Sequence, residues 1–280
     1  MKDPDQGQPR QPGMRPQSLL LSFLGLYVLG RDIAVYSGSV IEVFARLGVS
    51  EEAVRSTLTR MVKRDLLARH RHKRRTYFGL TARSTAVLED GSRRIWETGA
   101  VNRDWDGTWT LVGFSLPASE RSLRHDLRSQ LTWAGFGPLQ SGLWVAAGTK
   151  DVVAMLEDLG LDDEVTVLQA RALKPTESAD IVRKAFDTAQ IAERYRAFLD
   201  RWDRPDPLSD AVDDLARQLF LFGDWLQVLR RDPLLPAEHL PPDWPAIRAE
   251  TVFRHLASRY GPTAGGIAAA VLDTLPVRPA

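Results

Sequence analysis

The side chains best suited to contact another molecule are a group of cations and hydroxyls near residue 60. Arg55, Thr59 and Lys63 follow one another at intervals of four residues, with Ser56 and Arg60 beside them. Residues spaced by three or four are neighbours on one face of a helix. Long cations and small hydroxyls at this spacing reach phosphates and base edges from a helix in the DNA major groove. The five residues are therefore candidate DNA contacts, although a solvated charged face would show the same pattern.

The surrounding sequence predicts a helix that begins after Ser50. Ser50 is a favourable N-cap, and Glu51 and Glu52 place negative charge in the first turn, where the helix dipole favours it. The opposite face is apolar and is formed by Ala53, Val54, Leu58, Met61 and Val62. Its helical spacing predicts that this face is buried.

Two further helices and a hairpin are predicted around the basic helix. An apolar stripe over 19–28 indicates a first helix, and 39–42 has the pattern of a capping box that opens a second one. Gly48 ends the second helix and leaves the short turn of a helix-turn-helix. Two β-prone runs, 66–68 and 76–80, then flank a tip dense in cations. This order of elements predicts a winged helix-turn-helix.

The hairpin tip supplies the second set of candidate DNA contacts. The set consists of Arg71, His72, Lys73, Arg74 and Arg75. These side chains would contact phosphates or the adjacent minor groove, although a solvated turn has the same composition. His70 and His72 would lie on one side of a strand, but no third metal ligand lies at a recognisable spacing, so we expect no metal site.

The net charge of the whole chain conceals this local positive charge. The net charge is only +1, from 37 basic and 36 acidic residues. Residues 15–95 hold 15 Lys and Arg against 7 Asp and Glu, a net charge of +8, which leaves −7 for the rest. Such asymmetry indicates a nucleic-acid-facing domain joined to an acidic body.

Length and composition limit the class of protein. A chain of 280 residues that is 44% hydrophobic can bury two or three small cores. There is no cysteine for a disulfide or a thiolate site, and no apolar run approaches the ~20 residues of a membrane span. The Pro- and Gln-rich residues 1–17 predict a disordered tail rather than a signal peptide, so we expect a cytoplasmic protein.

The body of the chain begins near Trp105 and alternates strands with helices. The predicted order is β-α-β-α-β, with strands at 109–116, 143–146 and 164–170, helices at 119–133 and 151–159, and a glycine-bearing turn at 135–142. This order predicts a ferredoxin-like α/β sandwich. Three amphipathic helices follow, at 178–202, 208–230 and 246–260, before a Gly-, Ala- and Pro-rich end that we expect to be loose.

Three separated motifs in this body point to one known family. They are WDGTW at 105–109, WAGFGPL at 133–139 with GLWV at 142–145, and DPLLP at 232–236 with Leu240-Pro241 and Trp244-Pro245. They resemble motifs of the PaaX family, bacterial repressors of phenylacetate and related aromatic catabolism. The resemblance covers about residues 18–260. It implies a winged helix, a Cas2-like ferredoxin fold, a helical C-terminal domain, a homodimer, and release from an operator in double-stranded DNA by a coenzyme A thioester, phenylacetyl-CoA in the best-known members.

Residues and resemblance together predict an α+β, multidomain chain. The expected parts are a disordered tail at 1–17, a winged helix-turn-helix at 18–98, a ferredoxin-like (Cas2-like) α/β sandwich at 104–174, an α-helical C-terminal domain at 177–262 and a flexible tail at 263–280.

Tryptophans and two arginines are the candidates for binding an acyl-CoA effector. The tryptophans could stack on an aromatic acyl group or an adenine; they are Trp105, Trp109, Trp133, Trp144, Trp225 and Trp244. Arg230 and Arg231 could hold coenzyme A phosphates as bidentate donors. Core packing would account for the tryptophans, and the dipole of a preceding helix for the arginines.

No enzyme motif is present. The sequence lacks GxSxG, a P-loop, HExxH and a dinucleotide fingerprint, so we expect neither catalysis nor a cofactor. One alternative is a Cas2-like metal-dependent nuclease, which would need an acid at the end of the first strand of the sandwich. Ser115 occupies that place, and Asp106 precedes the strand. A second alternative is a DNA-binding regulator without a small-molecule ligand.

Overall fold

The computed structural model describes residues 16–97, 99–117, 119–161 and 164–277. Residues 1–15 of the predicted N-terminal tail lie outside the described residues. The chain forms two compact units, which we call unit 1 and unit 2. Unit 1 comprises Met1–Glu97, Arg201–Leu226 and Thr251–Ala280, and unit 2 comprises Thr98–Asp200 and Gln227–Glu250. The expected domain boundaries stay predictions.

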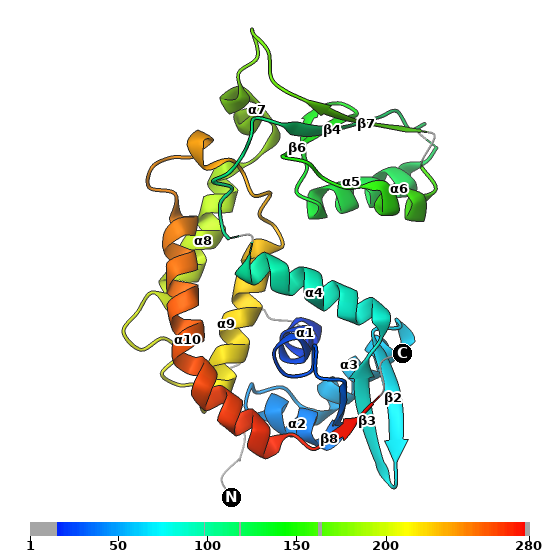
Figure 1. Cartoon of the computed structure of the whole chain (residues 1–280), viewed down its shortest axis with the longest axis vertical. Helices are drawn as coiled ribbons and strands as arrows, with labels where there is room; N and C mark the ends of the chain where they lie inside the picture. Colours follow the sequence, from blue (N-terminus) through cyan, green and yellow to red (C-terminus); the bar gives the residue numbers. More distant parts are fainter. Residues whose placement is uncertain (1–15, 98, 118, 162–163, 278–280) are drawn as a thin grey trace, which may run out of the picture. The chain divides into compact units, whose positions relative to one another are not determined.

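Unit 1 begins with a small α/β arrangement (Figure 1). Its elements are α1 (Pro16–Tyr27), β1 (Ile33–Tyr36), α2 (Ser37–Ala45), α3 (Glu51–Lys63), β2 (Leu67–His72), β3 (Arg75–Leu80) and α4 (Ala82–Trp96). A short strand near the C-terminus, β8 (Thr274–Pro276), completes a four-stranded sheet in the order β2-β3-β1-β8. All pairings in this sheet are antiparallel.

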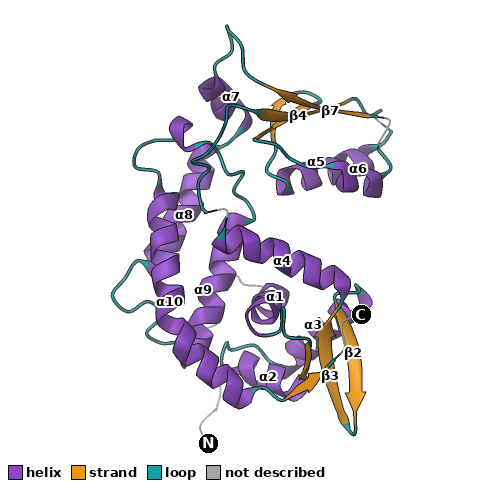
Figure 2. Ribbon diagram, viewed as in Figure 1, coloured by secondary structure: helices purple, strands orange, loops and turns teal. Residues whose placement is uncertain are grey.

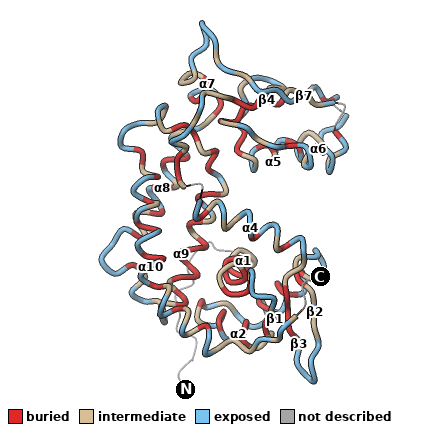
Figure 3. The backbone as a smooth tube through the Cα atoms, viewed as in Figure 1, coloured by how far each residue is buried: buried red, intermediate tan, exposed pale blue. Residues whose placement is uncertain are grey.

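Helix α1 is the centre of the first core, as its red tube in Figure 3 indicates. Leu19, Leu20, Phe23 and Leu24 are at most 2% exposed. The ring of Phe23 packs edge-on against Phe44 of α2. An apolar residue at nearly every position makes α1 a buried helix rather than an amphipathic surface one.

The start of α2 and the strand before it differ from the sequence prediction. Helix α2 begins at Ser37, after Tyr36, and has no side-chain N-cap. The capping box predicted at Ser39 is therefore wrong, because the Ser39 hydroxyl lies inside the helix and bonds to the C-terminal segment instead. Strand β1, which was not predicted, is only four residues long and lacks a clear alternating pattern.

The C-terminal residues are also ordered where a loose tail was expected. Helix α10 runs from Pro245 to Val271, past Pro262, and β8 follows it. The expected loose tail is wrong for the described part, 263–277, because Ala264 and Ala268 are buried and β8 pairs with β1. The small residues looked like linker composition in the sequence, but they belong to a helix that buries Ala264 and Ala268.

The central part of unit 2 is a second four-stranded antiparallel sheet, drawn in orange in Figure 2. Its elements are β4 (Trp109–Phe114), α5 (Arg121–Trp133), β5 (Gly137–Gln140), β6 (Leu143–Ala147), α6 (Val153–Leu159) and β7 (Val165–Ala170). The strand order β5-β6-β4-β7 gives the ferredoxin-like βαββαβ topology. The mixed α/β fold class is thus confirmed. Helices α5 and α6 cover one face of the sheet around Val112, Leu127 and Leu131, each fully buried.

Strand β5 lies where the sequence indicated only a turn. Its first residue, Gly137, packs against the end of α7 (Ser178–Ala185), and a Cβ there would lie 2.2 Å from the Ala185 carbonyl oxygen. The glycine is thus required for close approach of two backbones rather than for a turn.

The remaining helices also depart in detail from the expected three. The helix predicted at 178–202 is broken at Phe186, which is extended, into α7 and α8 (Thr188–Trp202). Helix α9 (Asp214–Leu229) begins six residues later than expected, and a 3-10 turn, η1 (Ala237–His239), precedes α10. Helices α8, α9 and α10 each contribute residues to both units.

Candidate nucleic-acid interface

Helix α3 presents one buried and one polar face, as its sequence predicts. The Ser50 hydroxyl accepts a hydrogen bond from Ala53 N at 3.3 Å and caps the helix. Val54, Leu58 and Met61 are at most 2% exposed and fix the helix against the core. The opposite face is solvent-exposed, so its side chains are available to a ligand.

The five candidate side chains of α3 share one surface hollow. The residues that line it are Glu51, Glu52, Arg55, Ser56, Thr59, Arg60 and Lys63. The structure thus brings together all five residues that the spacing placed on one face. It adds two carboxylates at the N-terminal end, so the face runs from acidic to basic along the helix.

Hydrogen bonds on this face already engage part of its charge. Arg55 Nε lies 2.7 Å from Glu51 Oε1 in an exposed ion pair. The Thr59 hydroxyl donates to the Arg55 carbonyl oxygen at 2.9 Å, and Arg60 donates to the Thr57 hydroxyl at 3.1 Å. Lys63 forms no ion pair within the described part of the chain. Sequence spacing located these residues but missed the Glu51 partner of Arg55, although their i, i+4 separation signals it.

The β2–β3 hairpin carries the second basic cluster. The last paired residues are His72 and Arg75, and Lys73 and Arg74 form the two-residue turn. Lys73 has a positive φ of 52°, which non-glycine residues adopt mainly in tight turns. Arg71, His72, Lys73 and Arg74 are exposed, so the tip presents three permanent cations and a histidine to solvent.

Arg75 differs from the other cations of the hairpin. Its Nη1 lies 2.5 Å from Asp273 Oδ2, and its guanidinium lies 5.0 Å from the centre of the Tyr36 ring. The hydrogen bond to Asp273 is the main reason that the pKa of Arg75 is raised. The sequence placed Arg75 with the free cations because its partner lies 198 residues away.

Comparison with known proteins identifies the family of this chain. Three family models match successive parts of it: "PaaX-like protein" over 15–84, "PaaX protein central Cas2-like domain" over 102–182 and "PaaX-like protein C-terminal domain" over 186–270. The chain belongs to the PaaX family.

Individual relatives agree with this membership. The "Transcriptional repressor PaaX" of Escherichia coli (strain K12) is 27% identical over 259 residues, which span 88% of this chain and 81% of the relative. A solved structure, the "Uncharacterized protein Rv0674 from Mycobacterium tuberculosis", has a TM-score of 0.60 at 22% identity and covers 90% of this chain and 98% of that one. The second likeness shows a shared fold only.

Four of the six candidate tryptophans of this PaaX-family chain are core residues. Trp109, Trp144, Trp225 and Trp244 are at most 7% exposed. Trp225 stacks on Phe253 within unit 1, with ring centres 4.8 Å apart, whereas the other candidate residues lie in unit 2. Core packing accounts for these four, and their effector role stays a prediction.

Two of the effector candidates meet at the surface of unit 2. Trp133 is 57% exposed, and the guanidinium of Arg230 lies 5.7 Å from the centre of its ring. Trp105 is partly buried, packs edge-on against Trp109 and His239, and donates to the Thr108 carbonyl oxygen at 2.7 Å. Arg231 is exposed. The Trp133–Arg230 pair therefore places an exposed aromatic ring beside a partly exposed cation.

The DPLLP motif contains a buried carboxyl group. The Tyr195 hydroxyl donates a hydrogen bond to Asp232 Oδ2, and Leu234 N donates to Oδ1 at 2.7 Å. Burial raises the pKa of Asp232 to about 6, although both hydrogen bonds and the nearby Arg194 oppose the shift. The group closes the turn after α9 and is only 9% exposed, so it is a structural feature of the motif.

The nuclease alternative finds no support in the geometry of Asp106. Its two oxygens accept hydrogen bonds from the Thr108 backbone N–H and hydroxyl, each at 2.9 Å, and these bonds lower its pKa. Asp106 thus closes the turn before β4. Within the described ranges, no group of three or more His, Cys, Asp and Glu side chains could hold a metal ion.

No helix of the described residues is long and apolar enough to cross a membrane.

Proposed function

We propose that this chain is a DNA-binding transcriptional repressor in which the first part of unit 1 forms a winged helix-turn-helix. The observation that carries the proposal is the pair of basic surfaces in unit 1, the exposed face of α3 and the tip of the β2–β3 hairpin. The repressor named among its relatives supports it. Helix α2, the turn at 46–50 and α3 would form the helix-turn-helix, and the hairpin would be the wing.

The two surfaces would divide affinity and sequence selection between them. Arg55, Ser56, Thr59 and Arg60 would reach base edges in the major groove, and Lys63 an adjacent phosphate. Arg71, His72, Lys73 and Arg74 would contact the backbone beside it. In a homodimer, two α3 helices would read half-sites about one helical turn apart or a multiple of it.

The proposed input is a coenzyme A thioester of an aromatic acid, such as phenylacetyl-CoA. We assign its first contact to Trp133 and Arg230, because the exposed indole could stack on an aromatic ring and the guanidinium could hold a phosphate. The regulated genes would then encode degradation of an aromatic compound. Such a regulator would act in the cytoplasm.

The decisive experiment measures binding of the purified chain to its own promoter region. Fluorescence anisotropy at several salt concentrations should give an affinity well above that for random DNA of equal length. The Arg60→Ala/Lys63→Ala double variant should lose that preference, whereas Arg121→Ala, an exposed residue of α5, should keep it. Equal affinity for both DNAs in the native chain would refute sequence-specific regulation.

A second arm of this experiment tests the effector. Phenylacetyl-CoA should release the native chain from promoter DNA, while coenzyme A alone should not. The Trp133→Ala variant should bind DNA normally but respond only at higher thioester concentration. If no acyl-CoA thioester changes DNA binding or thermal stability, the chain is a regulator without this ligand.

A further inference from the structure

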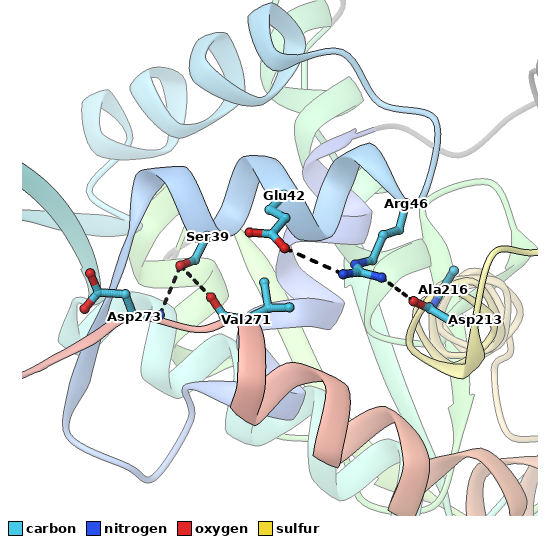
Figure 4. Close-up of polar contacts among 7 residues, drawn as sticks. All are labelled: Ser39, Glu42, Arg46, Asp213, Ala216, Val271 and Asp273. Carbon is cyan, nitrogen blue, oxygen red and sulfur yellow. Dashed lines mark hydrogen bonds and ion pairs between the residues drawn. The ribbon is translucent and has the colours of Figure 1, made fainter.

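The last residues of the described chain are built into the proposed DNA-binding part of unit 1. Strand β8 pairs with β1, with Thr274 opposite Val35, and Tyr36 N donates to the Asp273 carbonyl oxygen at 2.9 Å. The Ser39 hydroxyl donates to the Val271 carbonyl oxygen at 2.9 Å and accepts from Asp273 N at 3.0 Å (Figure 4). Backbone and side-chain bonds together therefore fix where the Asp273 carboxylate lies.

The Asp273 carboxylate reaches the hairpin from this fixed position. Besides the ion pair with Arg75 at 2.5 Å, it accepts a hydrogen bond from the Tyr77 hydroxyl at 3.2 Å. Arg75 and Tyr77 both belong to β3, the strand that leads away from the tip. Two residues of β3 thus meet at the carboxylate of Asp273, in the segment before β8.

The hairpin needs such a contact because its tip projects beyond the rest of the sheet. Strand β1 pairs with β3 only at Tyr77 and Phe78, whereas β2 pairs with β3 along its whole length from Arg75 to Leu80. Beyond Tyr77 the hairpin is a two-stranded ribbon, which is marginally stable by itself in water. Asp273 holds this ribbon through Arg75, the β3 residue next to the turn, so loss of the contact would let the exposed cations of the tip move.

We propose that Asp273 is a positioning residue for the proposed wing: it holds Arg75, the first β3 residue after the hairpin turn, so that Arg71, Lys73 and Arg74 meet DNA in a preset orientation, and Arg75 itself contacts no phosphate. This inference rests on the proposed function. It reassigns Arg75 from the group of DNA contacts to the frame that supports them.

The exposure of the Arg75–Asp273 ion pair favours a positioning role over a contribution to the stability of the fold. The side chains of Arg75 and Asp273 are 58% and 35% exposed, and exposed ion pairs change the free energy of unfolding little. Such a contact can affect the affinity for a ligand more than it affects stability. If the ligand requires one orientation of the tip, a contact that orders the tip beforehand reduces the entropy lost on binding.

The two roles of Arg75 differ in their effect on the salt dependence of DNA binding. Each lost phosphate contact reduces the slope of log K against log salt concentration by about 0.9. Arg74→Gln, the matched control in the turn, should show this change. Asp273→Asn and Arg75→Gln should weaken binding about three- to tenfold through lost preorganisation with no change in slope.

Rescue, a double variant and hydrogen exchange complete the test. Asp273→Glu should restore the affinity for DNA. The double variant Asp273→Asn/Arg75→Gln should bind DNA no more weakly than either single variant, because each single variant already removes the same interaction. Without DNA, the amides of 71–76 should exchange faster in Asp273→Asn but not in Arg74→Gln, at an unchanged melting temperature. If Asp273→Asn tightens DNA binding and steepens its slope, Arg75 is a phosphate contact and the proposal is wrong.

Hydrogen exchange also separates this proposal from the proposed function. If the native chain does not bind DNA, the proposed function fails, while faster exchange at the tip would still support the coupling of Asp273 to the hairpin. Unchanged exchange in Asp273→Asn would overturn the positioning role whatever the chain binds.

Discussion

Glu51 and Arg55 form an ion pair on the exposed face of α3, with 2.7 Å between Oε1 and Nε. Both side chains are about 60% exposed, so the pair contributes little to stability and can open when a ligand approaches. While it is closed, it holds one of the helix cations beside a negative charge. The proposed DNA-reading face is therefore partly neutralised before DNA arrives.

We predict that Glu51→Gln increases affinity for DNA of any sequence. The substitution removes a repulsive charge and frees Arg55, so the slope of log K against log salt concentration should steepen by about 0.9 if Arg55 gains a phosphate. Anisotropy titrations over a salt series would measure it, with Glu89→Gln on α4 as the exposed control. A loss of affinity confined to promoter DNA would instead mean that Glu51 accepts a hydrogen bond from a base such as cytosine.

Thr59→Ala and Arg74→Ala should separate sequence selection from general affinity. Thr59 lies in the middle of the exposed face of α3, so loss of its hydroxyl should reduce the preference for promoter over random DNA by roughly tenfold. Arg74 is in the hairpin turn and should affect both DNAs alike. Competition gel shifts with both DNAs would measure the ratios, and the reverse pattern would exchange the two roles.

Local sequence signals were enough to predict α3 and its exposed side chains. Ser50 caps the helix, and of the five apolar positions Val54, Leu58 and Met61 are buried, whereas Ala53 and Val62 are only partly buried. Both features depend only on residues within a few turns of one another. The candidate DNA surface could therefore be predicted as a set of neighbours, while its use stays a proposal.

Features that depend on distant residues could not be predicted in this way. Ser39 looks like an N-cap in the sequence, but it bonds to Val271 and Asp273, more than 230 residues away. The ion pair that engages Arg75 has the same origin. Gly137 suggested a turn because a close backbone approach to α7 leaves no periodic pattern. Aromatic residues gave a weak effector signal, because a tryptophan looks the same in a sequence whether it is buried or exposed.

We predict that Asp213→Ala destabilises unit 1 more than Asp213→Asn. Asp213 Oδ1 accepts from Ala216 N at 3.0 Å at the start of α9, and Oδ2 lies 2.5 Å from Nη1 of Arg46, the residue that follows α2 (Figure 4). Alanine removes both contacts and should lower the free energy of unfolding by about 1–2 kcal/mol, the usual range for a lost helix cap. Asparagine keeps an oxygen for the cap and should cost less. Urea unfolding would measure the difference, and equal losses would mean that the ion pair, rather than the cap, carries the effect.

The buried Asp232 should make stability depend on pH in an unusual direction. Its pKa in the folded chain, about 6, lies above the ordinary value of 3.8, so between these values the folded state binds more protons than the unfolded state. The free energy of unfolding contributed by this group therefore falls as pH rises through that window. Carboxylates in exposed ion pairs have the opposite dependence, so the net curve of the native chain mixes both.

Asp232→Asn isolates this group, because asparagine does not titrate. We predict that the free energy of unfolding of the native chain minus that of the variant falls by roughly 1 kcal/mol between pH 5 and pH 7, and changes little above pH 7. Other titratable groups contribute equally to both proteins and cancel in the difference. Urea unfolding at half-unit pH intervals would measure it. A difference that is constant with pH would mean that hydrogen bonds from Tyr195 and Leu234 keep Asp232 ionised despite its burial.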